Sequence, residues 1–146
     1  MPAGRYAAAA AGVVVQLPCA KLTFAANQLI KKNRWIFVDW QGYLTAENIK
    51  TGAKAYTDAL ARSGFSQVLN DTRSVRGPWD HSMDWVINER APNAAKAGLR
   101  HFAMTTSPAT LAEGSAANFY AQLTAFQGAV FDNTAEAEAW LRQQQQ

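Results

Sequence analysis

Asp80, His81 and Ser82 are consecutive in the sequence, and Asp84 follows two residues later. A carboxylate, an imidazole and a hydroxyl are the groups of a serine-hydrolase triad, in which the histidine activates the serine as a nucleophile. The spacing argues against this chemistry, because neighbouring residues of a helix do not face each other. The sequence also has no Gly-x-Ser-x-Gly motif to expose the serine. We interpret the four residues as the polar start of a helix.

Other residues that could ligate a metal or attack a substrate are few and widely separated. His101 is the only other histidine and lies in a predicted strand, and Cys19 is the only cysteine. These residues do not make a zinc site, a lone cysteine forms no disulfide within the chain, and no glycine-rich phosphate loop is present. We therefore expect no catalytic residue, no metal, no cofactor and no enzymatic activity, with Cys19 in a structural role.

A polar stretch, Asn70-Asp71-Thr72-Arg73-Ser74, follows the apolar pair Val68 and Leu69. We expect a short buried strand, residues 65–70, to end here in a polar loop. In an open α/β sheet, ligands meet the fold at the carboxyl ends of the strands. The stretch is therefore either a binding edge or a loop whose side chains satisfy its own backbone through local turns.

The helix expected after Gly77-Pro78 extends this candidate edge. Its first turn should bring Asp80 to the same rim as Asp71. The proposed edge for a ligand or a protein partner comprises eight residues: Asn70, Asp71, Thr72, Arg73, Trp79, Asp80, Ser82 and Trp85.

Tryptophan is abundant, with five residues in a chain of 146. The positions of Trp35, Trp79 and Trp140 predict core packing, whereas Trp40 at a strand end and Trp85 on the second helix lie near the polar stretch. Tryptophan combines a large apolar surface with one hydrogen-bond donor, which suits ligand pockets and dimer surfaces. An aromatic rim at the edge is therefore an alternative to core filling.

The composition is that of an ordinary globular domain. Hydrophobic residues make up 49% of the chain and charged residues 17%, which suffices for one domain with a real core. The net charge of +3 comes from scattered basic residues, and the one cluster, residues 31–34, falls where a hairpin turn is expected. Without a basic stripe or a known motif, we expect no nucleic-acid partner and no membrane span. The partners that remain to be considered are another protein, a second copy of this chain in a homodimer, or a small apolar ligand.

Hydrophobic periodicity predicts five strands and four helices. We expect strands over residues 21–27, 35–40, 65–70, 99–105 and 129–131. We expect helices over residues 45–64, from 77 to a break or kink at Pro92, from a Ser107-Pro108 start to 123, and from a Thr134 cap to 142. The first two strands should be antiparallel, and strands joined by helices parallel. The predicted fold class is α/β, a single mixed, mostly parallel sheet with helices packed on it, in the order β-β-α-β-α-β-α-β-α.

We expect one folded domain, residues 21–142, between an Ala-rich N-terminal extension, residues 1–20, and a polar tail, residues 143–146. The extension should be frayed, with residues 13–17 ordered against the sheet. Its apolar run after Arg5 also has some features of an export leader, but it is shorter than the roughly 20 residues that span a bilayer. We expect a cytoplasmic protein, since the single cysteine fits a reducing compartment.

Four segments carry a family resemblance: residues 35–42 (WIFVDWQG), 68–72 (VLNDT), 97–103 (AGLRHFA), and Phe131 with 136–141 (EAEAWL). Together they resemble the STAS superfamily, the fold of anti-sigma-factor antagonists. They are most similar to its bacterial SpoIIAA-like branch, for which a similarity to CRAL-TRIO lipid-transfer domains is also claimed. The resemblance implies a mixed sheet with helices on it and no cofactor.

In signalling members of that superfamily, a serine that follows an aspartate at the start of the second helix is phosphorylated. Here Asp80 matches the aspartate, but His81 stands where the serine would be, so a switch would need a register slip to Ser82. Phosphate at Ser82 would suit the positive start of a helix.

Three functions follow from these expectations. The first is a non-enzymatic STAS-like regulatory or protein-interaction module that uses the eight-residue edge. The alternative is a binding protein for a small apolar or lipid-like ligand, which an apolar cavity lined by Trp40, Trp79 or Trp85 would favour. An enzyme ranks last, because no nucleophile–base pair or metal set can be assembled.

Overall fold

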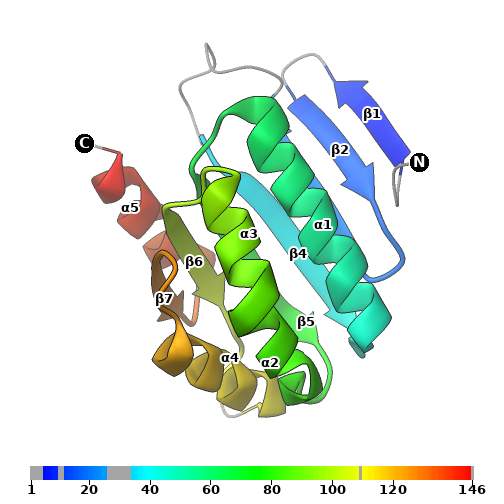
Figure 1. The fold of residues 1–146 in the computed structure, drawn as a ribbon, viewed down its shortest axis with the longest axis vertical. Coiled ribbons are helices and arrows are strands. Elements are labelled where there is room, and N and C mark those ends of the chain that lie inside the picture. Colours follow the sequence, from blue (N-terminus) through cyan, green and yellow to red (C-terminus); the bar gives the residue numbers. More distant parts are fainter. Residues whose placement is uncertain (1–4, 10–11, 26–33, 109, 146) are drawn as a thin grey trace.

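The computed structural model describes residues 5–9, 12–25, 34–108 and 110–145, and its centre is one seven-stranded sheet (Figure 1). The strands lie side by side in chain order: β1 (Arg5–Ala9), β2 (Gly12–Gln16), β3 (Ala20–Ala25), β4 (Ile36–Gly42), β5 (Gln67–Val75), β6 (His101–Thr105) and β7 (Gln127–Phe131). Strands β1 to β4 pair antiparallel, and strands β4 to β7 pair parallel. The predicted α/β class with a mixed sheet is confirmed.

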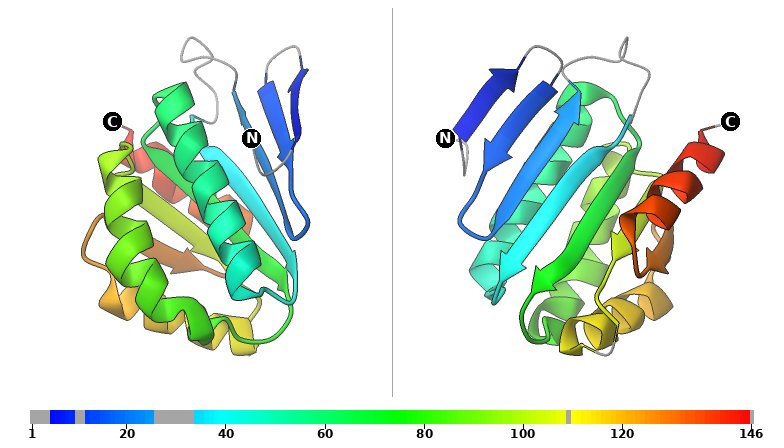
Figure 2. Two further views of the ribbon diagram at one scale, coloured as in Figure 1. Left: turned by 45° about the vertical axis from the view of Figure 1, so that its right-hand side comes forward. Right: turned by 180° about the vertical axis from the view of Figure 1, so that it is seen from behind.

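Helices cover the two faces of the sheet unequally. One face carries α1 (Ala46–Ser63) and the second helix, which is composed of η1 (Asp80–Ser82), α2 (Met83–Trp85), η2 (Val86–Arg90) and α3 (Ala91–Lys96). Helix α4 (Leu111–Gln122) lies at the end of the sheet toward which β5 and β6 point, and α5 (Thr134–Gln144) lies on the opposite face (Figure 2). Strands β4 to β7 follow one another across the sheet in one direction. Because parallel crossovers are right-handed, the helices that connect these strands lie on the same face. We call it the helical face and the other the α5 face.

Helix α1 begins and ends where the sequence predicts. Thr45 Oγ1 accepts a 3.0 Å hydrogen bond from the N–H of Asn48, which satisfies one of the free donors of the first turn. Gly64 follows the last turn with φ of 76° and donates its N–H to Leu60 O. Glycine adopts this left-handed conformation without steric cost. Ile49, Ala53, Tyr56 and Leu60, spaced three or four residues apart, form the apolar face of the helix and are buried in the core cluster with residues of the sheet.

Apolar burial forms two clusters, one on each face of the sheet. Val38 and Val68 belong to the larger cluster on the helical face, whereas Leu69, Ala103 and Leu141 belong to the smaller cluster under α5. Successive residues of a strand point to opposite faces, so Val68 and Leu69 contribute to different clusters. Strand β5 is therefore buried on both faces, as expected for a central strand.

The N-terminal twenty residues differ from the expectation of a frayed extension. Residues 5–9 and 12–16 form β1 and β2, which continue the sheet beyond β3. Val13 and Val15 are buried in the helical-face cluster, so residues 13–17 are ordered as expected. Three of the six strand pairings are consequently antiparallel, a larger share than predicted. Most of the predicted turn at residues 28–34 lies outside the described residues.

The second helix is continuous but changes its pitch. It begins as a 3₁₀ turn and widens into a π turn at Val86–Arg90, where the N–H of Ala91 bonds to Val86 O. The helix continues through Pro92, which follows this turn within α3, so the break that was one of the two effects expected of this proline is absent. Proline lacks an N–H, and in a regular α-helix its ring clashes with the carbonyl four residues earlier. The wider turn accommodates the proline, and such turns are frequent at functional sites.

The last two helices begin near the expected residues, but other side chains cap them. Thr110 Oγ1 accepts a 3.1 Å hydrogen bond from Glu113 N–H at the start of α4, so the helix does not start at Ser107-Pro108. Asn133 caps α5, one residue before the predicted Thr134. Several Ser, Thr and Asn residues near each start could all cap a helix, so sequence alone does not choose between them.

Candidate functional site

The polar stretch 70–74 belongs to a strand and not to a loop. Strand β5 pairs with β6 as far as Asp71 and with β4 as far as Val75. A register shift between Asp39 and Gln41 of β4 lets β5 carry one additional residue. The predicted strand end at residue 70 is therefore wrong. Pairing with β4, joined by pairing with β6 as far as Asp71, outweighs the weak strand preference of polar residues.

The alternation of β5 sends the polar side chains to opposite faces. Asn70 and Thr72 lie on the helical face, whereas Asp71 and Arg73 lie on the α5 face, where Asp71 bonds to Thr105. A single edge is therefore not formed. Five of its eight proposed residues are buried, with exposures of 3–6%: Asn70, Asp71, Thr72, Trp79 and Ser82.

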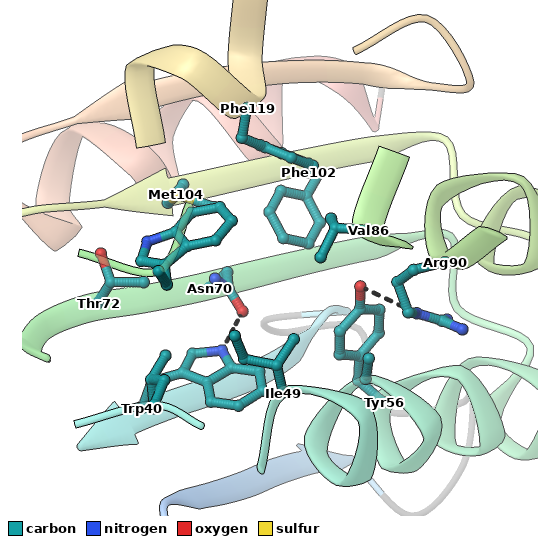
Figure 3. Close-up of a pocket in the computed structure, with 13 residues that line it drawn as sticks. Trp40, Ile49, Tyr56, Asn70, Thr72, Val86, Arg90, Phe102, Met104 and Phe119 are labelled. Carbon is teal, nitrogen blue, oxygen red and sulfur yellow. Dashed lines mark hydrogen bonds between the residues drawn. The ribbon is translucent and has the colours of Figure 1, made fainter. Parts of the chain in front are cut away.

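A pocket lies on the helical face between the sheet, α1, the second helix and α4 (Figure 3). Its walls are mainly aromatic and aliphatic. It has a volume of about 50 Å³, within a hollow of about 470 Å³ that is partly open to solvent. We call it the aromatic pocket, and its lining residues are Trp40, Leu44, Ile49, Ala53, Tyr56, Asn70, Thr72, Trp79, Val86, Arg90, Phe102, Met104 and Phe119.

The indole of Trp40 forms part of the floor of the aromatic pocket. Trp40 Nε1 donates a 2.6 Å hydrogen bond to Asn70 Oδ1, which joins β4 to β5 across the helical face (Figure 3). The ring also packs against the backbone of α1 at Gly52, where a Cβ atom would overlap it. The buried amide of Asn70 is thus used to hold a tryptophan, since buried polar groups need partners.

Two residues that line the pocket each have a buried hydrogen-bond donor without an acceptor. Arg90 is 5% exposed, its guanidinium lies 5.0 Å from the ring centre of Tyr56, and its Nε donates to the Tyr56 hydroxyl at 3.4 Å. Arg90 Nη2 and Trp79 Nε1 are both buried without a hydrogen-bond partner. Within the described part of the chain, no carboxylate forms an ion pair with Arg90. A buried charge without a counter-ion is costly, and a tyrosine ring offsets only part of that cost.

Asp71 is the centre of a polar cluster on the α5 face. Its carboxylate accepts hydrogen bonds from Arg73 Nε and Nη2 at 3.0 Å each and from Thr105 Oγ1 at 2.8 Å. Burial alone would raise the pKa of Asp71, but the bonds from Arg73 and Thr105 outweigh burial and hold that pKa below its ordinary 3.8. The hydrogen bond to Asp71 in turn raises the pKa of Arg73. The cluster fastens the end of β5 to β6, which gives Asp71 a structural role.

Replacing Asp71 with asparagine should lower the free energy of unfolding at pH 7 by about 1–2 kcal/mol, because a charge-assisted pair is lost. The lowered pKa means that the carboxylate stabilises the fold above pH 3.8, and that this contribution is lost as the pH falls through the folded-state value. Urea unfolding should therefore show a smaller difference in the free energy of unfolding between wild type and Asp71→Asn at pH 3 than at pH 7. The exposed Asp58→Asn is the control, and a difference independent of pH would contradict the prediction.

Asp80 connects the second helix to α4 and does not meet Asp71. Ser115 Oγ donates to Asp80 Oδ1, and Asn118 Nδ2 donates to Oδ2 at 3.1 Å. The hydrogen bonds from Ser115 and Asn118 lower the pKa of Asp80. Ser115 also accepts the N–H of Trp79 at 3.0 Å. The prediction that Asp71 and Asp80 share a common rim is therefore wrong. The carboxylate of Asp71 lies on the α5 face, whereas that of Asp80 accepts hydrogen bonds from α4.

His81 and Ser82 do contact each other, although neighbouring residues of a regular helix would not. Ser82 Oγ lies 3.0 Å from His81 Nδ1, and His81 Nε2 lies 2.9 Å from Leu44 O. A carbonyl only accepts, so Nε2 carries a proton, and in the neutral imidazole Nδ1 accepts from Ser82. With 5% exposure, Ser82 is closed to a substrate and to a kinase in the folded state. The pair ties the second helix to the chain after β4.

The remaining tryptophans and the cysteine lie outside the aromatic pocket. Trp35 is buried in the cluster under α5 and Trp140 packs against that cluster, as predicted for core residues. Trp85 is half-buried beside the helical-face cluster. Cys19 is a free, half-buried thiol whose Sγ lies 3.1 Å from Asn48 Nδ2. In the described ranges, no group of three or more histidine, cysteine or acidic residues could hold a metal.

The pocket brings together three residues of the proposed edge, Asn70, Thr72 and Trp79, with Trp40 of the expected aromatic rim. The sequence did not single out Arg90. The signal available was its spacing, because Arg90 continues the apolar face of the second helix four residues after Val86.

No family model, no curated protein and no solved structure was found to match this chain. The resemblance to the STAS superfamily therefore stays a prediction. Among the helices that the structure describes, none has the length and apolar character needed to cross a bilayer.

Proposed function

We propose that the protein is a non-enzymatic binding protein that holds a small apolar molecule in the aromatic pocket. The observation that carries the proposal is the unfilled space among Trp40, Tyr56, Trp79 and Phe102, side chains large enough to fill a core. Protein interiors are close-packed, with few voids larger than a water molecule. Pockets with apolar walls and a few placed polar groups are typical of ligand sites.

The size of the pocket restricts the ligand. A volume of about 50 Å³ exceeds the roughly 10–15 Å³ that one water needs, but it is well below the roughly 300–1,000 Å³ of pockets for drug-sized ligands. A long lipid chain would therefore require the walls to move, and a compact molecule would not. Of the two ligand types that the sequence suggested, the geometry favours the small apolar one.

The regulatory or protein-interaction function has less support. Of the eight residues proposed for the edge, Arg73 and Asp80 are exposed and Trp85 is half-buried, whereas the others are buried. Binding of a protein partner needs a contiguous surface with aromatic or arginine anchors at its centre. Arg73 bonds to Asp71 and Asp80 bonds to Ser115 and Asn118 of α4, so both exposed side chains already have partners within the fold.

Benzene should bind to the wild-type protein and raise its free energy of unfolding, by about 1.4 kcal/mol at ten times the dissociation constant. Ala53→Leu should abolish this effect, because Ala53 lines the pocket from α1 and the added carbons would occupy it. Thermal unfolding with and without benzene, together with the NMR shift of the Trp40 indole N–H, measures benzene binding by the wild type and by Ala53→Leu.

Lys54→Leu is the matched control, since it adds leucine to the same helix at an exposed position. This variant should respond to benzene as the wild type does. Absence of any benzene effect on the wild type, or an undiminished effect in Ala53→Leu, would refute the proposed function.

A further inference from the structure

We infer that the ligand of the aromatic pocket is a small monocarboxylate, whose carboxylate is bound by Arg90 and whose apolar part lies among the aromatic rings. This inference rests on the proposed function and adds the chemical class of the ligand. It comes from a side chain that the fold itself leaves unsatisfied.

The polar groups of the pocket are unequally satisfied. Its acceptors are used: Asn70 Oδ1 accepts from Trp40 Nε1 at 2.6 Å, and no buried side-chain oxygen of the described residues is without a partner. Its donors are not, because Arg90 Nη2 and Trp79 Nε1 are buried and free. Unpaired buried donors are rare in folded proteins. A ligand that brings acceptor oxygens would satisfy these donors.

The charge of the site selects among acceptors. Arg90 is 5% exposed and contacts a tyrosine ring and hydroxyl, with no ion pair among the residues that the structure describes. The sequence positions outside the described ranges contain no Asp or Glu, so they supply no side-chain carboxylate either. A guanidinium presents its N–H groups in a planar fork that matches the two oxygens of a carboxylate. An anionic ligand would supply the missing counter-charge.

The arrangement of the pocket suits a molecule with one polar end. Figure 3 shows Arg90 toward one end, beyond Tyr56, and Thr72 and Met104 toward the other, with Phe102 between them. The π turn that ends at Arg90 carries both this residue and Val86 to the wall of the pocket. With about 50 Å³ available, the apolar part of the ligand must be short. Butyrate is a suitable probe for these dimensions.

Butyrate and butyramide test the inference, because they have nearly the same shape and differ in charge. Titrations of the full chain are followed by NMR at Arg90 Nε–H and Trp79 Nε1–H. Butyrate should bind at least tenfold more tightly than butyramide and shift both signals. Arg90→Met, which substitutes for the aliphatic part of the side chain but removes the guanidinium, should reduce the ratio of affinities to about one while butyramide still binds. Arg90→Lys should retain part of the preference.

Each other outcome has a distinct meaning. Equal binding of butyrate and butyramide by the wild type overturns the inference and leaves the proposed function standing, provided that benzene binds. Chloride that competes as tightly as butyrate overturns it in favour of a simple anion site. If neither probe nor benzene binds, the inference and the proposed function both fail. If Arg90→Met does not fold, the comparison on the wild type decides.

Discussion

Replacing Phe102 with alanine should lower the free energy of unfolding by about 3–5 kcal/mol and enlarge the aromatic pocket. Phe102 is 4% exposed, and its ring centre lies 6.2 Å from that of Tyr56, 5.8 Å from that of Phe119 and 5.6 Å from that of Phe126. It stands on β6, which is paired on both sides by β5 and β7. The backbone therefore cannot move inward to fill the space, and a cavity should remain.

Urea unfolding of Phe102→Ala measures the loss, and benzene measures the cavity. Benzene should stabilise the variant more than it stabilises the wild type, because binding to the folded state alone shifts the unfolding equilibrium. Phe37→Ala is the control, since Phe37 is half-buried on the α5 face and does not line the pocket. Benzene should not stabilise this variant more than the wild type. A loss below 1 kcal/mol in Phe102→Ala would show that Phe102 does not hold the pocket together.

Some features of the fold that depend on local sequence, the ends of α1 and the fold class, were predicted correctly, whereas the caps of α4 and α5 were not. Thr45 and Gly64 delimit α1 as expected, because the chemistry of a cap is contained within a few neighbouring residues. The α/β class follows from the change of hydrophobic period between strands and helices, which is also a local signal. The crossovers then require the strands β4 to β7 to be parallel.

Features that depend on pairing between distant residues were predicted less well. Strand β5 continues through five polar residues because β6 pairs with it as far as Asp71 and β4 as far as Val75, and no local pattern records the presence of those neighbours. The same reason explains β1 and β2, which extend the sheet by antiparallel pairing beyond β3. An alanine-rich stretch has a weak strand preference by itself.

The candidate site shows the same division. Asn70 and Thr72 were singled out because they follow an apolar strand, but they were expected at an exposed edge, and they instead line a pocket. Because β5 continues to Val75, the residues after Leu69 alternate between the two faces of the sheet. A strand that ended at residue 70 would not have fixed their side chains in this way. Arg90 could have been noticed from its spacing on the apolar face of the second helix, since a charged residue at such a position is unusual.

Replacing Gly52 with alanine should destabilise the protein by about 1–3 kcal/mol, although helix propensity predicts the opposite sign. Alanine in the interior of a helix is about 1 kcal/mol better than glycine, and Gly52 lies within α1. An added Cβ, however, would overlap the six-membered ring of Trp40. That indole is 5% exposed and held by its 2.6 Å hydrogen bond to Asn70, so it cannot turn aside without breaking the bond.

Gly114→Ala is the matched control, because Gly114 lies within α4 and an added Cβ there meets no atom within 4 Å. Urea unfolding should show a gain of up to about 1 kcal/mol for Gly114→Ala and a loss for Gly52→Ala. In a Trp40→Leu background, Gly52→Ala should become neutral or stabilising, because the ring that the methyl group would strike is gone. The Trp40 indole N–H signal should shift in Gly52→Ala and stay unchanged in Gly114→Ala. If Gly52→Ala stabilises the protein as Gly114→Ala does, Trp40 does not pack on α1 as the structure shows, and the floor of the aromatic pocket is misplaced.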